Sequence, residues 1–409
     1  MTKKSDAPAI RFKGFSDAWE QRKVQDVADR FDNLRIPVAA NLRVHGTTPY
    51  YGANGIQDYV EGFTHDGEFV LVAEDGANDL KNYPVKCVNG RIWVNNHAHI
   101  LQGKAGIADN SFLAFAISQS DIESLLVGGG RAKLNAETLM SIEFRLPCLQ
   151  EQYRIGEYLT QLDHLITLHQ RKFEKLTNVK KSMLEKMFPQ NGSSYPEIRF
   201  KGFTDPWEQR KLGELVDRVV RKNTNNESTL PLTISAQYGL VDQITYFNNR
   251  VASRDVSNYY LVLNGEFAYN KSTSDGYPFG AVKRLDLYEK GVLSTLYIVF
   301  APKKEQQIDS DYLTVFFDTD RWHKGVAERA AEGARNHGLL NISAEDFFDI
   351  DLSVPKDIVE QKQIGAFIRQ LDNLITLHQR KCISFTGRAG RLISVSYTHL
   401  RAHETGAYL

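Results

Sequence analysis

Two segments of this chain carry the same narrow stripe of apolar residues, spaced alternately four and three positions apart. The first segment covers residues 151–172 and the second covers residues 360–381, an offset of 360 − 151 = 209 residues. Both copies end in the string LITLHQRK, and the match includes polar as well as apolar positions. A match of this kind indicates an internal duplication.

The stripe predicts two long amphipathic helices, because alternating steps of four and three are the heptad spacing of coiled coils. A proline precedes each copy, and acidic residues occupy the opening turns, as is typical of helix starts. The predicted coiled-coil seam consists of Ile155, Leu159, Leu162, Ile166, His169, Phe173 and Leu176 in the first copy, and of Ile364, Ile368, Leu371, Ile375 and His378 in the second.

Narrow apolar stripes favour pairing of the two helices with each other. The alternative is two core helices in separate domains, which usually carry a wider apolar face. A first helix of about 33 residues would span roughly 50 Å, whereas the linker at residues 188–197 reaches at most about 35 Å. We therefore predict an antiparallel coiled coil with pseudo-twofold symmetry.

A second repeat precedes each globular part of the chain. The string IRFKGF-x-D-x-WEQRK occupies residues 10–23 and 198–211, an offset of 198 − 10 = 188 residues. Phe12, Phe15 and Trp19 are large apolar residues in a segment too short to form its own core. Two interpretations stay open: an adaptor that docks each globular segment on the helices or on a partner, or simple packing at the leading edge of a domain.

Between these repeats lie two globular segments with little similarity to each other, and each predicts a mixture of short strands and helix. In the first we expect strands at 68–73, 91–94, 99–101 and 142–146, and a helix at 111–127 that stops at the glycines 128–130. In the second we expect strands at 230–235, 259–263, 266–269, 296–300 and 349–354, and a helix at 311–319. The fold class is therefore α+β.

The chain is predicted to divide into seven parts. These are an N-terminal arm (1–22), a first globular domain (23–148), a central helix (149–188), a linker with the second arm repeat (189–210), a second globular domain (211–357), a distal helix (358–386) and a divergent tail (387–409). Gly387 and Gly390 would each cost about 1 kcal/mol inside a helix. We therefore expect an altered or truncated, partly disordered C-terminus from about residue 384, which would leave the start of the first helix without a partner.

Composition is that of an ordinary globular protein, with 42% hydrophobic and 24% charged residues among 409. The chain has no run of eighteen apolar residues and no signal-peptide pattern, so we expect a cytoplasmic protein without a membrane segment. Three scattered cysteines suit a reducing compartment. A formal net charge of zero argues against purely electrostatic binding of nucleic acid, although local basic patches remain compatible with it.

Motifs for catalysis are missing from the sequence. There is no P-loop, no N/D-P-P-[YF] motif and no nucleophile–base–orienter set. His97 and His99 could suggest a metal pair, but no carboxylate or cysteine follows at a helpful spacing. His169 and His378 lie on the predicted seam, where a packed polar residue is expected. We predict no catalytic residue and no metal ligand.

Several strings resemble the specificity subunit of type I restriction–modification enzymes, over residues 10–381. They are the two KGF-x-D-x-WEQRK copies, PYYGANGIQDY at 49–59, WVNNHAHIL at 93–101, GEFAYNKSTSDGYPFGAVKRL at 265–285 and GVLSTLYIVF at 291–300. The resemblance implies a non-catalytic subunit in which two target-recognition domains alternate with two helices. It also implies methyltransferase and restriction/translocase partners, with S-adenosylmethionine, ATP and Mg on those partners and no cofactor on this chain.

Two unlike domains on a rigid spacer would recognise two half-sites of double-stranded DNA with a fixed gap. The outer helix faces, Gln170, Arg171 and Lys172 with their repeats Gln379, Arg380 and Lys381, match so closely that we expect two methyltransferase subunits to bind them. The alternative is a coiled-coil scaffold or assembly protein without DNA specificity, which leaves the two divergent domains unexplained.

Amide, basic and aromatic residues in loops are the candidates for DNA contact, because Arg and Lys suit guanine and Asn and Gln suit adenine. Each could instead be a solvated turn residue or a phosphate contact. The candidates are Tyr50, Tyr51, Asn54, Gln57, Asn95, Asn96, His97, Arg131 and Lys133 in the first segment, and Gln237, Tyr238, Asn270, Lys271, Ser272, Ser274, Tyr277, Lys283, Arg284, Arg335, Asn336 and His337 in the second.

Overall fold

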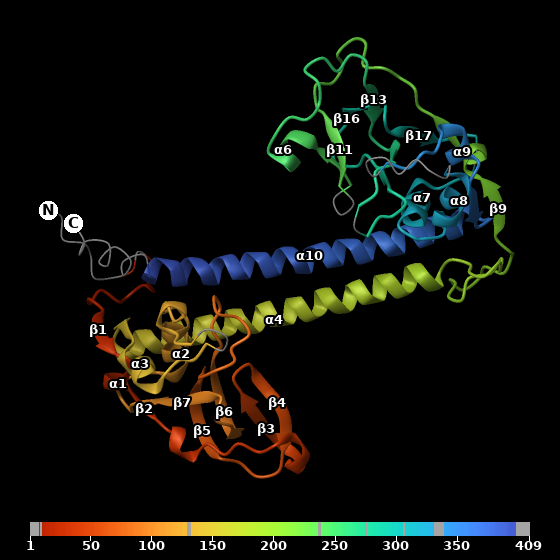
Figure 1. The fold of residues 1–409 in the computed structure, drawn as a ribbon. Helices are drawn as coiled ribbons and strands as arrows, with labels where there is room; N and C mark the ends of the chain where they lie inside the picture. The colour runs from red at the N-terminus through yellow and green to blue at the C-terminus, as the bar shows by residue number, and fades with distance from the viewer. Residues whose placement is uncertain are drawn as a thin grey trace. The chain divides into compact units, whose positions relative to one another are not determined.

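Two long helices and two globular domains make up the part of the chain that the structure, a computed structural model, describes. The described residues are 8, 10–128, 132–235, 239–274, 276–305, 307–330 and 339–397, with side chains described up to 386. The chain divides into two compact units, Met1–Gln170 with Gln379–Leu409, and Arg171–His378. Each unit holds one globular domain and part of the helices α4 (Leu149–Lys186) and α10 (Ile358–Tyr397), which Figure 1 labels.

The first domain is built on a six-stranded sheet in the order β2-β7-β5-β6-β3-β4, in which only the β3–β6 pair is parallel. A separate antiparallel pair joins β1 to β8. The strands are β1 (Glu20–Lys23), β2 (Ala28–Arg30), β3 (His45–Gly52), β4 (Gly55–Val60), β5 (His65–Ala73), β6 (Val85–Val94), β7 (Ala98–Gly103) and β8 (Glu143–Leu146). The helices are α1 (Val24–Val27), η1 (Asp32–Leu34), η2 (Ala40–Leu42), α2 (Asn110–Ser118), η3 (Glu123–Leu125) and α3 (Ala136–Ser141).

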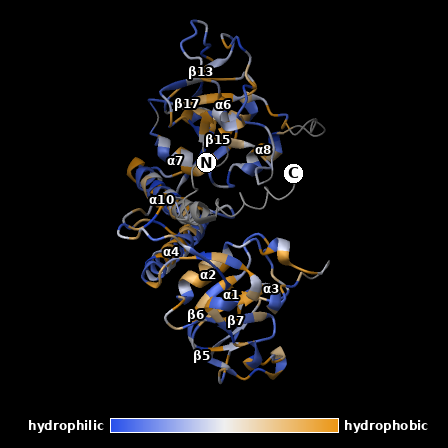
Figure 2. Cartoon of the chain, turned by 90° about the vertical axis from the view of Figure 1, so that its left-hand side faces the viewer, coloured by the Kyte–Doolittle hydropathy of each residue, from blue (hydrophilic) through white to orange (hydrophobic). Residues whose placement is uncertain are grey.

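Strand β5 lies at the centre of this domain because both of its faces are apolar. Val70 and Val72 belong to one buried cluster, and Phe69 and Leu71 belong to another on the opposite face. Such a continuous apolar run is typical of a strand that is covered on both sides. Helix α2 supplies one cover, with Phe112, Leu113 and Ile117 in the same cluster as the two valines, and Figure 2 shows its apolar colouring beside β6 and β7.

The predicted helix at 111–127 is too long, since α2 ends at Ser118. At the end of α2 two serine hydroxyl groups form hydrogen bonds with backbone carbonyls. Ser118 Oγ donates to Phe115 O at 2.8 Å, and Ser120 Oγ donates to Ala116 O at 3.3 Å. Side-chain hydrogen bonds of this kind compete with continuation of a helix. The glycines at 128–130 are therefore not the helix stop.

The second domain contains a four-stranded antiparallel sheet, β10-β17-β14-β15, and three two-stranded pairs, β11-β12, β13-β16 and β9-β18. Its strands are β9 (Glu208–Lys211), β10 (Val216–Arg218), β11 (Leu232–Ser235), β12 (Gly239–Asp242), β13 (Tyr260–Leu263), β14 (Phe267–Asn270), β15 (Ala281–Arg284), β16 (Lys290–Leu293), β17 (Ile298–Pro302) and β18 (Asp351–Val354). Its helices are α5 (Leu212–Leu215), α6 (Gln243–Phe247), α7 (Ser310–Phe317), α8 (His323–Arg329) and α9 (Ala344–Phe348).

The two domains share a common frame. Strand order β2-β7-β5-β6 in the first corresponds to β10-β17-β14-β15 in the second, and the pair β1-β8 corresponds to β9-β18. They differ in what is inserted between equivalent strands. The first domain inserts β3 and β4 before β5, whereas the second inserts β11, β12, α6 and β13 before β14 and adds β16 before β17. The α+β fold class is confirmed.

Each arm repeat docks on the start of its own long helix. In the first unit Phe12 packs edge-on against Tyr158, with ring centroids 5.8 Å apart, and Arg11 binds Glu151. In the second unit Phe200 packs in the same way against Phe367, at 5.9 Å. The arm also places Trp19 in the core of its domain, so its contacts fit both the adaptor and the packing interpretation.

Burial along the long helices follows the predicted seam. Leu159, Leu162, Ile364, Ile368 and Leu371 are buried, and the other seam positions are buried or half-buried. Within the second unit Lys180 of α4 binds Asp372 of α10 at 2.7 Å, and within the first unit His169 of α4 stacks on Phe385 of α10. Each unit therefore contains a contact between a segment of α4 and a segment of α10.

The predicted end of the second helix near residue 386 is too early, because α10 continues to Tyr397. One glycine costs only about 1 kcal/mol in a helix interior, and the neighbouring Arg388, Ala389, Arg391 and Leu392 are good helix formers. The described helix therefore extends past both Gly387 and Gly390.

Candidate nucleic-acid interface

Candidate residues from three separate stretches of the first domain come together around the turn that follows β5. Asn54 Nδ2 donates to Gly76 O at 2.9 Å, and Asn54 Oδ1 accepts from Asn78 N at 2.9 Å. His97 Nδ1 lies 2.5 Å from Asp75 Oδ1. Contacts between residues so distant in sequence define one polar surface, which we call the first polar cluster: Asn54, Gln57, Asn96, His97 and Lys133.

Beneath this surface lies a network of charged residues. Arg35 Nη1 binds Glu74 Oε2 at 2.5 Å, and Lys133 Nζ binds Glu74 Oε1 at 2.9 Å. His99 is buried, with Nδ1 2.7 Å from Asp32 Oδ2 and Nε2 2.9 Å from Leu134 O. Five polar groups thus fix the loops on which the first polar cluster is carried.

The charges of this network are those of ion pairs. Burial by itself would raise the pKa of Glu74, but hydrogen bonds from Arg35 and Lys133 outweigh it and lower the pKa. Burial would likewise raise the pKa of Asp32, and the hydrogen bonds from His99 and from the amide of Ile100 lower it. Both carboxylates are therefore ionised at neutral pH.

Three candidates of the first domain are buried, and for these the structure corrects the prediction. Tyr50 is 1% exposed, its hydroxyl accepts from Val38 N at 2.9 Å and its ring stacks on Trp93. Tyr51 and Asn95 are 7% and 4% exposed, and Asn95 Nδ2 donates to Gln57 Oε1 at 3.3 Å. These side chains are packed in the core beneath the cluster, so they are not available to contact DNA.

The remaining described candidates of the first domain are accessible. Asn54, Gln57, Asn96 and Lys133 are exposed, and His97 is half-buried. Asn54 holds the turn as well, through the two hydrogen bonds given above. Asn96 therefore presents the freest amide group of this set for an adenine edge.

In the second domain the candidates lie on the loop between β14 and β15. Ser272 forms an isolated bridge with Leu339, and Leu340 N donates to Lys271 O at 3.0 Å. Lys271 Nζ also donates to Ile342 O at 3.3 Å. The loop thus lies beside residues 339–342. Ser272, Ser274 and Tyr277 are exposed, whereas Asn270 and Lys271 are half-buried.

The close of this loop requires a glycine. Gly280 has φ +75°, and a Cβ atom there would lie 2.1 Å from Asn270 O. Any other residue would displace the end of β14. The same contact sets where Asn270 and Lys271 emerge from the sheet.

Two basic candidates of the second domain are held by carboxylates. Lys283 Nζ binds Asp318 at 2.7 Å. Arg284 binds Asp311 at 2.8 Å and Asp286 at 2.7 Å, and its side chain is 12% exposed. Their charges are neutralised within the domain, so the structure places both in the contacts of β15 with α7 and not on a surface for DNA.

Arg131, Gln237, Tyr238, Arg335, Asn336 and His337 lie outside the described residues. The prediction for these six stays a prediction.

Sequence reasoning missed Arg35 and two aromatic residues of α6. Tyr246 and Phe247 are 48% and 51% exposed and pack edge-on against each other, and Asn248 follows in the left-handed conformation. Exposed aromatic rings next to amides and Arg250 suit stacking on bases. The string TYFNNR carried this signal. Arg35 binds Asp32, three positions away, but its partners Glu74 and Ala98 lie 39 and 63 positions away.

Metal and membrane features are not found in the described part of the chain. Among those residues no group of three His, Cys, Asp or Glu side chains is placed to hold a metal ion. No described helix is long and apolar enough to cross a bilayer.

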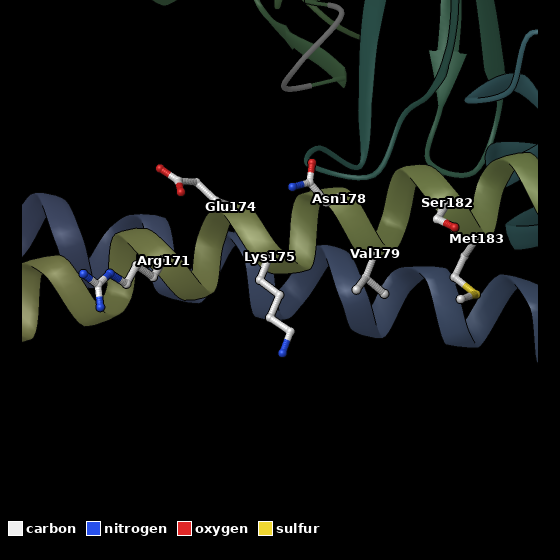
Figure 3. Close-up of a pocket in the computed structure, with 7 residues that line it drawn as sticks. All are labelled: Arg171, Glu174, Lys175, Asn178, Val179, Ser182 and Met183. Atoms are coloured by element: carbon white, nitrogen blue, oxygen red, sulfur yellow. The ribbon is translucent and has the colours of Figure 1, made fainter. Parts of the chain in front are cut away.

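One groove lies along α4 within the second unit (Figure 3). Its lining is a single helical stripe: Arg171, Glu174, Lys175, Asn178, Val179, Ser182 and Met183. It is therefore an open groove along one face of α4, with Val179 and Met183 half-buried at one end.

The family model described as "Type I restriction modification DNA specificity domain" matches the chain twice, at residues 16–178 and 204–384. Each match covers one globular domain with most of the long helix that follows it. The two matches together cover most of the chain.

Individual proteins give the same result. A putative type I restriction enzyme specificity subunit of Haemophilus influenzae is 29% identical over 362 residues, which cover 87% of this chain and 88% of that protein. The type I restriction enzyme MjaVIII specificity subunit of Methanocaldococcus jannaschii is 29% identical over 218 residues, 49% of each chain. A crystal structure of the type I restriction–modification S subunit from M. genitalium has a TM-score of 0.65 at 13% identity, covering 95% of this chain and 98% of that one, and shows a similar fold.

Proposed function

The chain belongs to the family of type I restriction–modification DNA specificity proteins, and from this premise we propose that it recognises a bipartite DNA sequence. Each globular domain would bind one half of the target. The observation that carries the proposal is the common frame with two different insertions. Equal frames place the domains in the same way on their helices, while unequal insertions present different side chains to DNA.

The first half-site would be recognised by the first polar cluster. Asn96 and Gln57 supply amides for adenine, and Lys133 supplies a cation for guanine or a phosphate. The second would be recognised by the β14–β15 loop with Tyr277, and by the exposed rings of Tyr246 and Phe247. A base contact of this kind discriminates by about 1–3 kcal/mol.

We propose that α4 and α10 form an antiparallel pair that fixes the gap between the half-sites. Globular domains spaced about one turn of the duplex apart, roughly 34 Å, would contact the same face of B-DNA. The contacts of Lys180 with Asp372 and of His169 with Phe385, each inside one unit, support the pairing.

Two methyltransferase subunits are the proposed partners of the outer helix faces, together with the restriction/translocase subunits of the full complex. Gln170, Arg171, Lys172, Arg380 and Lys381 are exposed, and Gln379 is half-buried. The groove of Figure 3 begins at Arg171. Chemistry would belong to the partners, which would bind S-adenosylmethionine, ATP and Mg.

The proposal is tested by expressing the chain with its methyltransferase partner and sequencing the methylated adenines of the host. A two-part motif with a constant gap is expected. In a binding titration of the motif duplex at several salt concentrations, Asn96→Ala should weaken binding by about 5- to 150-fold, equivalent to about 1–3 kcal/mol. The matched control is Asn89→Ala, at an exposed position on β6 outside the cluster, and it should leave the binding affinity unchanged. A scaffold without DNA specificity would give neither a motif nor salt-dependent binding.

A further inference from the structure

The starts of α4 and α10 carry the same buried ion pair to the arm of their own domain. Arg11 donates from Nε and Nη2 to the two oxygens of Glu151, both at 2.7 Å. Arg199 does the same to Glu360, at 2.7 and 2.8 Å. The two glutamates are 0% and 1% exposed. Paired bonds of this kind fix orientation as well as distance, because the fork of the guanidinium matches the carboxylate.

The next residue of each helix makes three hydrogen bonds that are also repeated. Gln152 Oε1 accepts from Asp109 N at 2.9 Å, and its Nε2 donates to Ile107 O and Pro147 O at 3.0 and 2.9 Å. Gln361 contacts the corresponding groups at Asp309, Gln307 and Pro355, at 2.8, 3.1 and 2.9 Å. Each glutamine therefore uses both ends of its amide to hold the loop that starts α2 or α7.

A glycine completes each set by allowing close approach. A Cβ atom on Gly156 would lie 2.6 Å from Asp109 Oδ1 and 3.0 Å from Phe112 N. On Gly365 it would lie 2.7 Å from Asp311 Cβ and 3.1 Å from Tyr312 N. Asp109 and Asp309 are the N-caps of α2 and α7, so the long helix meets the same helix end in both domains. We call Glu151, Gln152 and Gly156, with Glu360, Gln361 and Gly365, the docking motif.

Stability alone gives no reason to use buried charges at this position, since a well-packed apolar contact is often equally stable or more so. Three directional contacts instead fix a single orientation and position of the domain on its helix. The two domains share this geometry although their insertions differ. The close match of the two helices at these positions is therefore explained by docking of the domains, without any partner protein.

We propose that the docking motif is the positioning device that sets the DNA gap, by fixing how each domain sits on its own helix. This inference rests on the proposed function. One base pair advances along the duplex by roughly 3.4 Å. A change in domain orientation of that order at the DNA would make a different gap acceptable, with every base-contacting residue unchanged.

The test uses the full chain in complex with its methyltransferase partner and measures methylation against gap length on duplexes with the two half-sites at varied spacing. Arg11→Lys and Arg199→Lys retain the charge but lose the paired geometry, and Gly156→Ala pushes α2 away from α4. The matched controls are Arg22→Lys and Arg210→Lys, whose ion pairs with Glu20 and Glu214 lie on the surface.

The docking variants should lower the methylation rate at the preferred gap by roughly 10- to 100-fold, because a misplacement of about 1 Å can cost 100-fold. On duplexes with a gap one base pair longer or shorter, the methylation rate should fall by a smaller factor. The plot of methylation rate against gap length should therefore broaden. The controls should keep the wild-type profile. Circular dichroism and the affinity for each half-site alone should be unchanged, which a merely structural role would not predict.

An unchanged gap profile in folded docking variants would overturn the inference, with the proposed function intact. Failure of the two lysine variants to fold would overturn it as well, because the contact would then serve folding itself. A wild-type complex with no fixed gap would instead refute the proposed function on which the inference rests.

Discussion

The two globular domains differ in their insertions and agree in their attachment to the helices. The first domain inserts β3 and β4 between β2 and β5, whereas the second inserts β11, β12, α6 and β13 between β10 and β14. The contacts of Glu151 and Gln152, in contrast, recur at Glu360 and Gln361 almost atom for atom. This contrast separates two tasks. The insertions are free to change with the DNA sequence, while the attachment is constrained by geometry.

The attachment is not identical in every detail, and the exceptions are informative. Trp207 Nε1 donates to Glu360 Oε1 at 3.3 Å, whereas Trp19 Nε1 is buried with no partner among the described residues. The second unit also has Lys180 between Asp318 and Asp372. Position 180 + 209 = 389, its equivalent by the repeat, is alanine. The second unit thus has a lysine contact between two carboxylates that the sequence does not repeat at the equivalent position.

The largest effect is expected from Arg199→Ala and Arg11→Ala. Each leaves a fully buried glutamate without its counter-charge, which costs about 3–5 kcal/mol. Because the two pairs are equivalent, each variant should destabilise its own domain and leave the other unaffected. Hydrogen–deuterium exchange of peptides from 24–148 and 212–357 measures the two separately.

The matched control for this pair is Arg22→Ala, whose partner Glu20 is exposed. It should change stability by less than about 1 kcal/mol. Equal losses in all three variants would show that the buried pairs have no special role.

A smaller loss, roughly 1.5–3 kcal/mol, is expected from Lys180→Met. Burial would lower the pKa of Lys180, but Asp318 and Asp372 outweigh it and raise the pKa. For Asp318, burial would raise the pKa, and Lys283 and Lys180 lower it below its usual 3.8. The stabilisation from Asp318 is therefore present above 3.8 and is lost as the pH falls through the lower folded pKa.

Removal of Lys180 weakens this effect, so acid unfolding of the second unit should begin at a higher pH than in the wild type. Acid titration followed by circular dichroism measures the shift. Lys181→Met, an exposed neighbour on α4, is the control and should leave the acid transition in place. An unchanged midpoint in Lys180→Met would contradict the role assigned to this lysine.

Much of the fold could be predicted because it is repeated or periodic. The heptad stripe located both helices, and burial of Leu159, Leu162, Ile364 and Ile368 follows it. Strand β5 was evident from the apolar run at 68–73. Helix α2 was predicted too long, since the hydroxyl groups that end it act through local hydrogen bonds and leave apolar periodicity unchanged.

The candidate interface was predicted less well. Tyr50, Tyr51 and Asn95 have the residue types of DNA contacts, but they are buried, and residue type does not show burial. Lys283 and Arg284 are bound by Asp318 and Asp311, between 27 and 35 positions away. The docking motif was visible only as identity between the two helices. The contacts that explain it come from distant loops.

Replacing the two arm tryptophans by phenylalanine is expected to give losses of unfolding free energy that differ by about 1–2 kcal/mol, with the larger loss for Trp207→Phe. Both Trp19→Phe and Trp207→Phe remove similar volume beside Phe112 or Tyr312. Only Trp207→Phe also removes a hydrogen bond to a charged oxygen. Trp19→Phe instead removes a buried donor that lacks a partner, which offsets part of the cavity cost. Urea unfolding of each variant gives the difference, and equal losses would contradict it.

The smallest effect concerns Asp163 and Asp372, which are equivalent by the repeat. Asp372→Asn removes one of the two carboxylates that bind Lys180 and should cost about 0.2–1 kcal/mol, as for a partly exposed ion pair. Asp163 behaves differently, because partial burial raises its pKa above the usual 3.8. Its ionised form is therefore disfavoured in the folded state, and stability decreases as the pH rises from 3.8 through the folded pKa.

Asparagine at position 163 stays neutral at every pH, so the decrease in stability that accompanies ionisation of Asp163 does not occur. Asp163→Asn should therefore leave stability at neutral pH unchanged or raise it by a few tenths of a kcal/mol, whereas the same change at position 372 should lower it. Thermal unfolding of the two variants at pH 7 and at acidic pH measures both signs. The difference between them should shrink in acid, where both wild-type carboxyls become protonated. Opposite signs at neutral pH would show that two near-identical helices contribute unequally to the two units, because the lysine that binds Asp372 has no counterpart at position 389.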